Sequence, residues 1–298
     1  MEKIKILLDT DLGSDCDDAG ALAVLHNLAD KGKAEILAVT HCGSEISGAV
    51  TIQAINEWYK RSDISVGRFD KGAFLEGEIY TRYTKPIMER YLHTNEIPKI
   101  ESSVRVLRKA LSYNKNVTIA VIGMMNNIAL LLKSEPDDIS SLNGIELVKS
   151  SVKNMYVMGG NFADLTNAEY NIKCDIESAQ YVSLNFPAPI TYCGFEIGIS
   201  VLTGKLLETA AEGNPVKFAY RIKAQDCGNQ NYLRYSWDPI TVYCAVEQDT
   251  SLYTKSDNVT VSFDDMGRTV LQEGGKDCYL IDNSSAETVQ AVIDELIY

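Results

Sequence analysis

The segment "IKILLDTDLGSDCDDAGAL", residues 4–22, contains the pattern from which we predict the fold. It opens with an apolar run at residues 4–8, passes through a turn crowded with aspartates, and continues as the small-residue segment "AGAL". An apolar run without alternation is typical of a strand buried on both faces, as in a parallel sheet. The sequence therefore predicts a buried strand, an acidic turn at its carboxyl end, and a helix packed close against the sheet.

The same order of strand and helix recurs along the chain, and amphipathic stretches separate the strands. Further apolar, β-branched runs lie at residues 34–42, 64–69, 116–123, 152–160 and 188–196. This alternation predicts βαβ units in an α/β fold with an open, mostly parallel, Rossmann-like sheet flanked by helices. The runs at 258–264, 269–275 and 277–282 predict a small antiparallel C-terminal portion. Because no Pro/Gly/Ser-rich linker divides the chain, we expect one domain over residues 1–298.

The composition excludes several kinds of partner. A formal net charge of −13 over 298 residues argues against a nucleic acid or an anionic membrane surface, because phosphate partners require clustered Lys and Arg. No run of apolar residues is long enough to predict a membrane span. Seven cysteines without a CxxC motif argue against a zinc site and indicate thiols in a reducing compartment. With an N-terminus that runs directly into a strand, these features predict a cytoplasmic protein.

The aspartates of the turn repel one another more than a helix terminus can offset. They are Asp9, Asp11, Asp15, Asp17 and Asp18. Two carboxylates about 5 Å apart repel by roughly 3 kcal/mol at an effective dielectric near 20, whereas each gains only about 0.3–1 kcal/mol from a helix dipole. Oxygen ligands without His or Cys select a hard cation, and an irregular site favours Ca²⁺ over Mg²⁺. A solvated turn that caps the helix is the alternative, and Asp15 alone fits a loop-bracing role better than ligation.

A metal in this turn needs further ligands from other strand ends. Asp238 in "SWDPITVYCAV" is one candidate, although an Asp before Pro also fits a helix N-cap followed by N1. A backbone carbonyl near Ile122, at the end of "TIAVIGMMNN", is another.

These residues carry a resemblance to a known family. "DTDLGSDCDDAGALA" resembles the acidic N-terminal motif of the inosine-uridine preferring nucleoside hydrolases. The agreement continues in order through "IGMMNNIALLL", "VMGGN", "AEYNIKCDIESAQYV" and "SWDPITVYCAV", and so covers most of the chain. The resemblance implies a nucleoside-hydrolase-like fold, a Ca²⁺ cofactor, a small-molecule nucleoside substrate and a homodimer or homotetramer.

The resemblance also implies roles for individual residues. The Ca²⁺ ligands would be Asp11, Asp18, Asp238 and the carbonyl of Ile122. Asp17 would bind the ribose hydroxyls, Asp9 would brace the cluster, and the 5′ and 3′ side of the sugar would be held by Glu169, Asn171 and Asn161. The implied reaction is hydrolysis of the N-glycosidic bond of a ribonucleoside, in which Asp11 takes the proton of a Ca²⁺-bound water that attacks C1′.

The chain departs from the family pattern at the acidic turn. The family has one residue between the glycine and the acidic pair, whereas three residues, 14–16, follow Gly13 here. It therefore stays open whether Asp15 or Asp18 is the metal ligand. An asparagine that the family has after the second strand is not evident, and Ser44 or Glu45 stands in its place.

A second departure concerns the base. Where the pyrimidine-tolerant branch has a histidine before the C-terminal aspartate, this chain has Trp237, which resembles the purine-preferring branch and predicts an indole stacked on the base. A core aromatic is the alternative. Tyr232, Arg234 and Tyr235 line the same pocket or serve helix packing. Of the three histidines, His26, His41 and His93, only His41 lies near a predicted strand end as a candidate acid.

Two other functions compete with the hydrolase. One is a non-catalytic, Ca²⁺-dependent nucleoside- or sugar-binding protein on the same scaffold. The other is a haloacid-dehalogenase-like phosphatase that uses Mg²⁺, with Asp9 as nucleophile and Asp11 as acid and base. That family has Thr or Val at the position of Gly13, and it assigns no role to the acidic pair.

Overall fold

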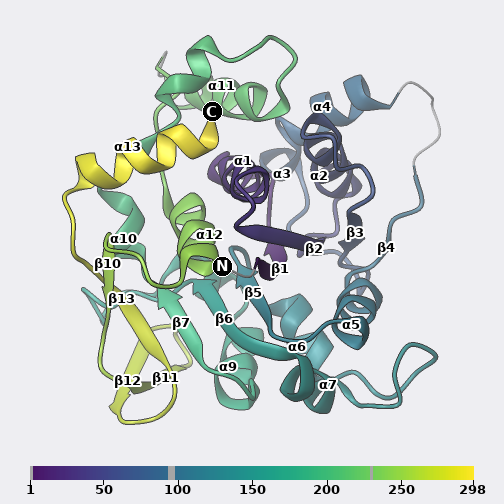
Figure 1. The fold of residues 1–298 in the computed structure, drawn as a ribbon, viewed down its shortest axis with the longest axis vertical. Coiled ribbons are helices and arrows are strands. Elements are labelled where there is room, and N and C mark those ends of the chain that lie inside the picture. The colour runs from purple at the N-terminus through teal and green to yellow at the C-terminus, as the bar shows by residue number, and fades with distance from the viewer. Residues whose placement is uncertain (1–2, 93–97, 229–230) are drawn as a thin grey trace.

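A nine-stranded sheet forms the centre of the protein, and helices cover both of its faces (Figure 1). The computed structural model describes residues 3–92, 98–228 and 231–298. In spatial order the strands are β10 (Tyr253–Lys255), β13 (Cys278–Asp282), β7 (Ile190–Cys193), β6 (Val152–Met158), β5 (Val117–Val121), β1 (Ile4–Thr10), β2 (Ala34–His41), β3 (Ser65–Arg68) and β4 (Glu101–Ser102). Each neighbouring pair is parallel except β10 with β13. The predicted α/β class with a mostly parallel sheet is confirmed.

The helices divide into two layers (Figure 1). One face of the sheet carries α1 (Asp17–Asp30), α2 (Ile46–Trp58), α11 (Pro215–Asp226), α12 (Trp237–Glu247) and α13 (Ala286–Ile297). The other face carries α5 (Ser103–Tyr113), α6 (Asn126–Leu132), α7 (Gly144–Ser151) and α9 (Ile176–Asn185). Shorter helices lie in the connections: α3 (Glu78–Thr81), α4 (Thr84–Tyr91), α8 (Tyr170–Cys174), α10 (Phe195–Ile199) and the 3₁₀ turn η1 (Lys205–Thr209).

The central strands are apolar throughout because both of their faces are covered. In β1, Ile6 and Leu8 join the core under α1, whereas Leu7 between them joins the core on the α5 side. All three side chains have no exposed surface. Successive side chains of a strand point to opposite faces, so a doubly covered strand needs an unbroken apolar run. This explains why the sequence pattern identified these strands.

The order of the strands creates a crevice beside β1. From β1 the chain proceeds outward through β2, β3 and β4 on one side, then returns to place β5, β6 and β7 on the other. Ligands of open α/β sheets bind at such a switch point, beyond the carboxyl ends of the strands. The acidic turn directly follows β1, and Ile122 directly follows β5.

The C-terminal part differs from the predicted antiparallel portion in one respect. Strands β11 (Val259–Phe263) and β12 (Thr269–Glu273) form an antiparallel hairpin, as expected. The third run, β13, instead enters the main sheet between β7 and β10, where both of its edges are paired. A short antiparallel pair, β8 (Leu202–Thr203) with β9 (Arg234–Tyr235), leads into α12. Within the three described segments, no helix is long and apolar enough to cross a membrane.

Packing of α5 against the sheet gives a test of the fold. Leu111 is fully buried, while Tyr113 on the same helix is 86% exposed. We expect Leu111→Ala to lower the free energy of unfolding by about 2–5 kcal/mol, because it removes buried methyl groups and leaves a cavity. The control Tyr113→Ala changes it by less than about 0.5 kcal/mol. Urea denaturation followed by circular dichroism measures both, and equal effects would contradict this packing.

Candidate active site

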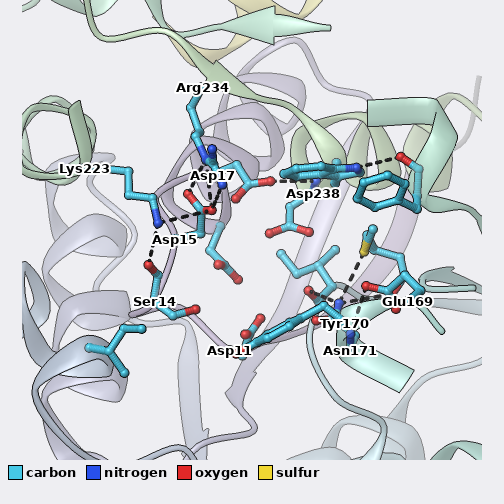
Figure 2. A pocket seen from close by; sticks show the side chains of 16 residues that line it. Asp11, Ser14, Asp15, Asp17, Glu169, Tyr170, Asn171, Lys223, Arg234 and Asp238 are labelled. Atoms are coloured by element: carbon cyan, nitrogen blue, oxygen red, sulfur yellow. Dashed lines mark hydrogen bonds and ion pairs between the residues drawn. The ribbon is translucent and has the colours of Figure 1, made fainter. Parts of the chain in front are cut away.

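A pocket of about 330 Å³ opens at the carboxyl edge of the sheet, beside the acidic turn (Figure 2). One wall is acidic and another is aromatic. Its lining residues are Asp11, Ser14, Asp15, Asp17, Asp18, Ile79, Ile122, Met158, Glu169, Tyr170, Asn171, Phe195, Lys223, Arg234, Trp237 and Asp238. They come from segments far apart in the sequence that the parallel strands bring to one edge.

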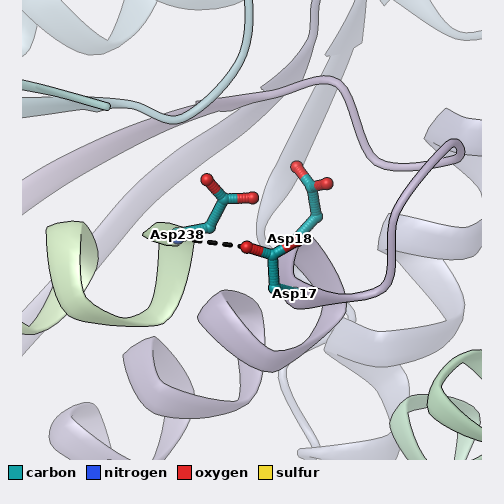
Figure 3. Close-up of side chains that lie close together, drawn as sticks. All are labelled: Asp17, Asp18 and Asp238. Carbon is teal, nitrogen blue, oxygen red and sulfur yellow. Dashed lines mark hydrogen bonds between the residues drawn. The ribbon is translucent and has the colours of Figure 1, made fainter. Parts of the chain in front are cut away.

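Three carboxylates meet in the acidic wall (Figure 3). One oxygen each of Asp17, Asp18 and Asp238 lie within 4.8 Å of one another, and all three residues are buried. The backbone N–H of Asp238 donates to the Asp17 carboxylate over 3.3 Å. Burial, reinforced by the neighbouring aspartates, raises the pKa of Asp17 to about 8 and those of Asp18 and Asp238 well above the usual value. An all-oxygen set of this kind fits a hard divalent cation.

Asp11 lies on the same wall, beside this group. It is 7% exposed, and burial raises its pKa to about 7, with the charge of Asp15 adding to the effect and a hydrogen bond with Asp18 opposing it. The group of three carboxylates that could hold a metal contains Asp17 together with Asp18 and Asp238, whereas the resemblance implies Asp11 as a ligand and Asp17 as a ribose contact. All four carboxylates line one pocket.

Asp9 lies behind the wall and is completely buried. One of its carboxylate oxygens accepts hydrogen bonds from the Thr40 hydroxyl and, over 2.7 Å, from the side-chain amide of Asn127. The other oxygen has no partner in the described structure. Thr10 donates similarly to Asp18. These bonds tie the acidic turn to β2 and α6, which is the arrangement expected of a bracing residue.

Asp15 has a different environment from the other aspartates of the turn. Its carboxylate accepts hydrogen bonds from Nε of Arg234 at 2.8 and 2.9 Å, and Nζ of Lys223 lies 3.4 Å away. Figure 2 shows Asp15 between these two cations. Among the aspartates of the turn, the close carboxylate group includes Asp18 but not Asp15. Asp15, one of the two residues by which this turn exceeds the family pattern, thus supplies a counter-ion for two basic side chains.

The floor of the pocket joins the ends of β5 and β6. Glu169 is buried, and its carboxylate caps α8 by accepting from the backbone N–H groups of Asn171 at 2.9 Å and Ile172 at 3.2 Å. The side-chain amide of Asn171 donates to the carbonyl oxygens of Ile122 and Met158, each at 3.3 Å. The carbonyl of Ile122 therefore faces the pocket region, as expected from its place at a strand end. Burial raises the pKa of Glu169 to about 7.

Asn161 does not line the pocket. Its side-chain oxygen accepts from the backbone N–H of Asp164 at 2.8 Å, so the carboxamide closes a local turn. Ser44 and Glu45 are also absent from the lining: Ser44 bonds to the Phe74 carbonyl, and Glu45 accepts from Gly77. Each of these three side chains, which the sequence analysis considered for the sugar, forms a hydrogen bond with the backbone of a loop instead.

Trp237 stands on the aromatic wall, where its indole N–H donates to the carbonyl oxygen of Phe195 over 2.8 Å. The Phe195 ring is stacked at 5.6 Å from the indole, and the Tyr235 ring lies 5.3 Å away. These contacts fix the plane of the indole while leaving it on the pocket surface. Of the three residues expected to line the same pocket or to serve helix packing, Arg234 lines it, whereas Tyr232 and Tyr235 are not among the lining residues.

The histidines of the described chain are engaged elsewhere. Both ring nitrogens of His41 lie within hydrogen-bond distance of carbonyl oxygens, of Gly43 at 2.9 Å and of Leu12 at 3.0 Å. Burial lowers the pKa of His41, and the neutral ring donates its one N–H to one of these two carbonyls. His26 is stacked on Tyr59 inside the core. Neither lines the pocket, and His93 lies outside the described residues. The candidate acid His41 is therefore held in a structural role.

Several lining residues were not identified from the sequence. Ile79 comes from α3, in the excursion after β3, and Phe195 from α10, and neither carries a polar signal. Lys223 lies on α11, which precedes the motif containing Asp238 and belongs to none of the motifs that were identified. Tyr170 stood between two predicted residues, and its hydroxyl lies 3.3 Å from that of Tyr80 at the pocket mouth.

Comparison with known proteins agrees with the fold. The family model for the inosine-uridine preferring nucleoside hydrolases matches residues 6–295. The chain therefore belongs to this family of glycosyl hydrolases, which cleave the N-glycosidic bond of nucleosides. This membership is confirmed, and it argues against the phosphatase alternative. A search of curated proteins found no match.

Solved structures share the fold over almost the whole chain. A plant nucleoside hydrolase, PpNRh1, is 20% identical, with a TM-score of 0.75 and coverage of 100% of this chain and 99% of that one. An inosine-uridine preferring nucleoside hydrolase from Bacillus anthracis is 18% identical, with a TM-score of 0.73 and coverage of 99% of each chain. The effector protein XOO4466 is 15% identical, with a TM-score of 0.75 and coverage of 99% and 93%.

The buried carboxylates predict a pH-dependent stability of the metal-free protein. Their raised pKa values mean that the folded chain binds more protons than the unfolded chain between about pH 4 and 8, so the free energy of unfolding falls as pH rises through this range. We expect added Ca²⁺ to restore more stability at pH 8 than at pH 5, because protons compete with the cation. Thermal unfolding with chelator or Ca²⁺ measures this, and a rise in metal-free stability with pH would contradict it.

Proposed function

We propose that this protein hydrolyses purine ribonucleosides to free base and ribose with the help of Ca²⁺. Family membership supports the reaction, and the aromatic wall supports the choice of base. The observation that carries the proposal is the meeting, in one pocket, of the carboxylates of Asp11, Asp17, Asp18 and Asp238 with the oriented indole of Trp237.

The base side of the pocket favours a purine. A purine presents a larger π-face to Trp237 than a pyrimidine does, and the electron-rich indole stabilises a base that gains positive charge by about 1–2 kcal/mol. No histidine of the described chain lines the pocket to protonate a poorer leaving group. Unactivated pyrimidine nucleosides are therefore expected to be poor substrates.

Ca²⁺ is the cation that the donors favour. Asp11, Asp18, Asp238 and the carbonyl of Ile122 form the proposed ligand set, with Asp17 beside them. Carboxylate and carbonyl oxygens suit Ca²⁺, which tolerates irregular geometry better than Mg²⁺ does. When bound, Ca²⁺ lowers the pKa of water and neutralises the buried charge.

The side chains of the pocket are assigned proton transfer and binding of the sugar. Asp11 accepts the proton of the water that attacks C1′, while the electron pair of the bond from C1′ to the base nitrogen passes to the base, which takes up a proton from solvent. Asp17 accepts hydrogen bonds from the ribose hydroxyls, and these contacts strengthen as the ring gains positive charge in an oxocarbenium-like transition state. Glu169 and Asn171 hold the 5′ and 3′ side of the sugar. Asn161, which lies outside the lining, would have to reach the sugar after a change of its loop.

Three broader expectations accompany this proposal. A continuous sheet containing strands from β1 to β13 supports one domain over residues 1–298. We further propose a homodimer or homotetramer, as the resemblance implies, and a cytoplasmic location, as the cysteine usage indicates. Analytical ultracentrifugation tests the oligomeric state.

The reaction is tested by following release of base and ribose from inosine, guanosine, adenosine and uridine. We expect kcat/KM for the purine nucleosides to exceed that for uridine by about 100-fold, since only the purines use the stacking wall fully. A calcium chelator abolishes the activity and added Ca²⁺ restores it. Asp11→Asn lowers kcat by about 10²–10⁴-fold through loss of the base, whereas the exposed control Asp63→Asn leaves it unchanged. Nucleoside binding without release of base would refute the proposal.

The role of the indole is tested with the two tryptophans of the chain, Trp58 and Trp237. Trp237→Ala is expected to lower kcat/KM for inosine by about 10–100-fold, in line with the loss of base stacking. Trp58→Ala is the matched control, because Trp58 lies on α2 outside the pocket. In a Trp58→Phe variant Trp237 is the one tryptophan left, and nucleoside binding should quench its tryptophan fluorescence. Equal activity of the two alanine variants would contradict base stacking.

A further inference from the structure

Arg234 lines the active-site pocket with hydrogen-bond donors that the protein leaves unused. A guanidinium carries five N–H groups in a fixed planar fork. The edge formed by Nε and Nη2 of Arg234 faces the carboxylate of Asp15, with Nε at 2.8 Å from Oδ1. Over the described chain, Nη1 makes no hydrogen bond. The end of the fork, with parallel N–H groups on Nη1 and Nη2, therefore stays free for a ligand.

Arg234 places these donors close to the aromatic residues that are proposed to bind the base. Its guanidinium carbon lies over the Trp237 ring, 5.6 Å from the ring centroid, and over the Tyr235 ring at 5.2 Å. Strand β9, which carries Arg234, pairs with β8 and runs into α12, and the indole is anchored on the Phe195 carbonyl. The guanidinium covers part of the indole face, so a base that packs against the rest of that face would have the guanidinium beside its edge.

Asp15 determines the orientation of that guanidinium. It comes from the turn that is longer than the family pattern, and Lys223 also lies 3.4 Å from its carboxylate. Without this carboxylate, two cations would repel each other at the pocket wall. The carboxylate of Asp15 holds the edge of the guanidinium formed by Nε and Nη2. The end of the guanidinium, formed by Nη1 and Nη2, remains available to a ligand.

We propose that Arg234 is a specificity-determining residue that recognises 6-oxopurines, with Asp15 as its positioning residue. This inference rests on the proposed purine nucleoside hydrolysis. In hypoxanthine and guanine, O6 and N7 are adjacent acceptors that match the two parallel N–H groups of a guanidinium. Adenine keeps N7 but presents an amino donor at position 6, which faces the cation unfavourably. Inosine and guanosine are therefore preferred to adenosine.

The ratio of kcat/KM for inosine to that for adenosine tests the proposal. We expect a ratio of about 10 or more in the unaltered protein, in the range of one bidentate contact. Arg234→Met brings it toward one, and Arg234→Lys, which keeps the charge but loses the fork, also lowers it severalfold. Arg268→Met is the matched control, because Arg268 pairs with Asp264 outside the pocket, and it leaves the ratio unchanged.

Binding of free bases separates this inference from the proposed hydrolysis. By calorimetry, hypoxanthine should bind the unaltered protein about tenfold more tightly than 7-deazahypoxanthine or adenine, and Arg234→Met should remove the difference. A protein that shows this difference yet releases no base refutes the hydrolysis and keeps the recognition. A protein that hydrolyses inosine and adenosine alike, with a ratio insensitive to Arg234→Met, refutes the recognition and keeps the hydrolysis.

Discussion

Repulsion between buried carboxylates governs the arrangement of the residues around the end of β1. Asp9, Asp11, Asp17, Asp18 and Asp238 are each nearly inaccessible to solvent. Several of their neighbours reduce the cost of this crowding: a threonine hydroxyl, an asparagine amide and a backbone N–H all donate to them. The raised pKa values show that these bonds do not offset burial completely. A shared cation or bound protons must supply the stabilisation that these hydrogen bonds do not provide. The protein therefore keeps a locally destabilising group of charges at the place where the reaction requires them.

The parallel sheet is what makes such a gathering possible. Because neighbouring strands run in one direction, the segments that follow β1, β5 and β6 all emerge at the same edge. Gly123, which follows Ile122, shows how closely these segments approach. A Cβ atom at this position would lie 2.7 Å from the backbone nitrogen of Asp11 and 2.8 Å from Sγ of Cys42. Only a residue without a side chain lets β5 end so near the acidic turn.

Sequence alone predicted the features that depend on local patterns. The doubly buried strands were visible as apolar runs, and placing the acidic turn at a strand end predicted that Asp11, Asp17 and Asp18 would line a ligand crevice. The partners of Asp15 could not be predicted in this way, because Arg234 lies 219 positions away in the sequence. The local bond of Asn161 depends on the conformation of its loop: the resemblance implies a sugar contact, whereas in the structure its side chain accepts from the backbone N–H of Asp164.

The packing of α13 on α1 has a consequence for how the protein is made. The side-chain amide of Asn27 in α1 donates to the carbonyl oxygen of Leu296 in α13 over 2.8 Å, a contact between segments 269 positions apart. Both helices contribute to one apolar core on the same face of the sheet. During synthesis the helix that begins with Asp17 and Asp18 therefore emerges from the ribosome long before its cover does. Until residues 286–297 follow, the helix that carries two of the acidic side chains keeps an apolar flank open to solvent or to a chaperone.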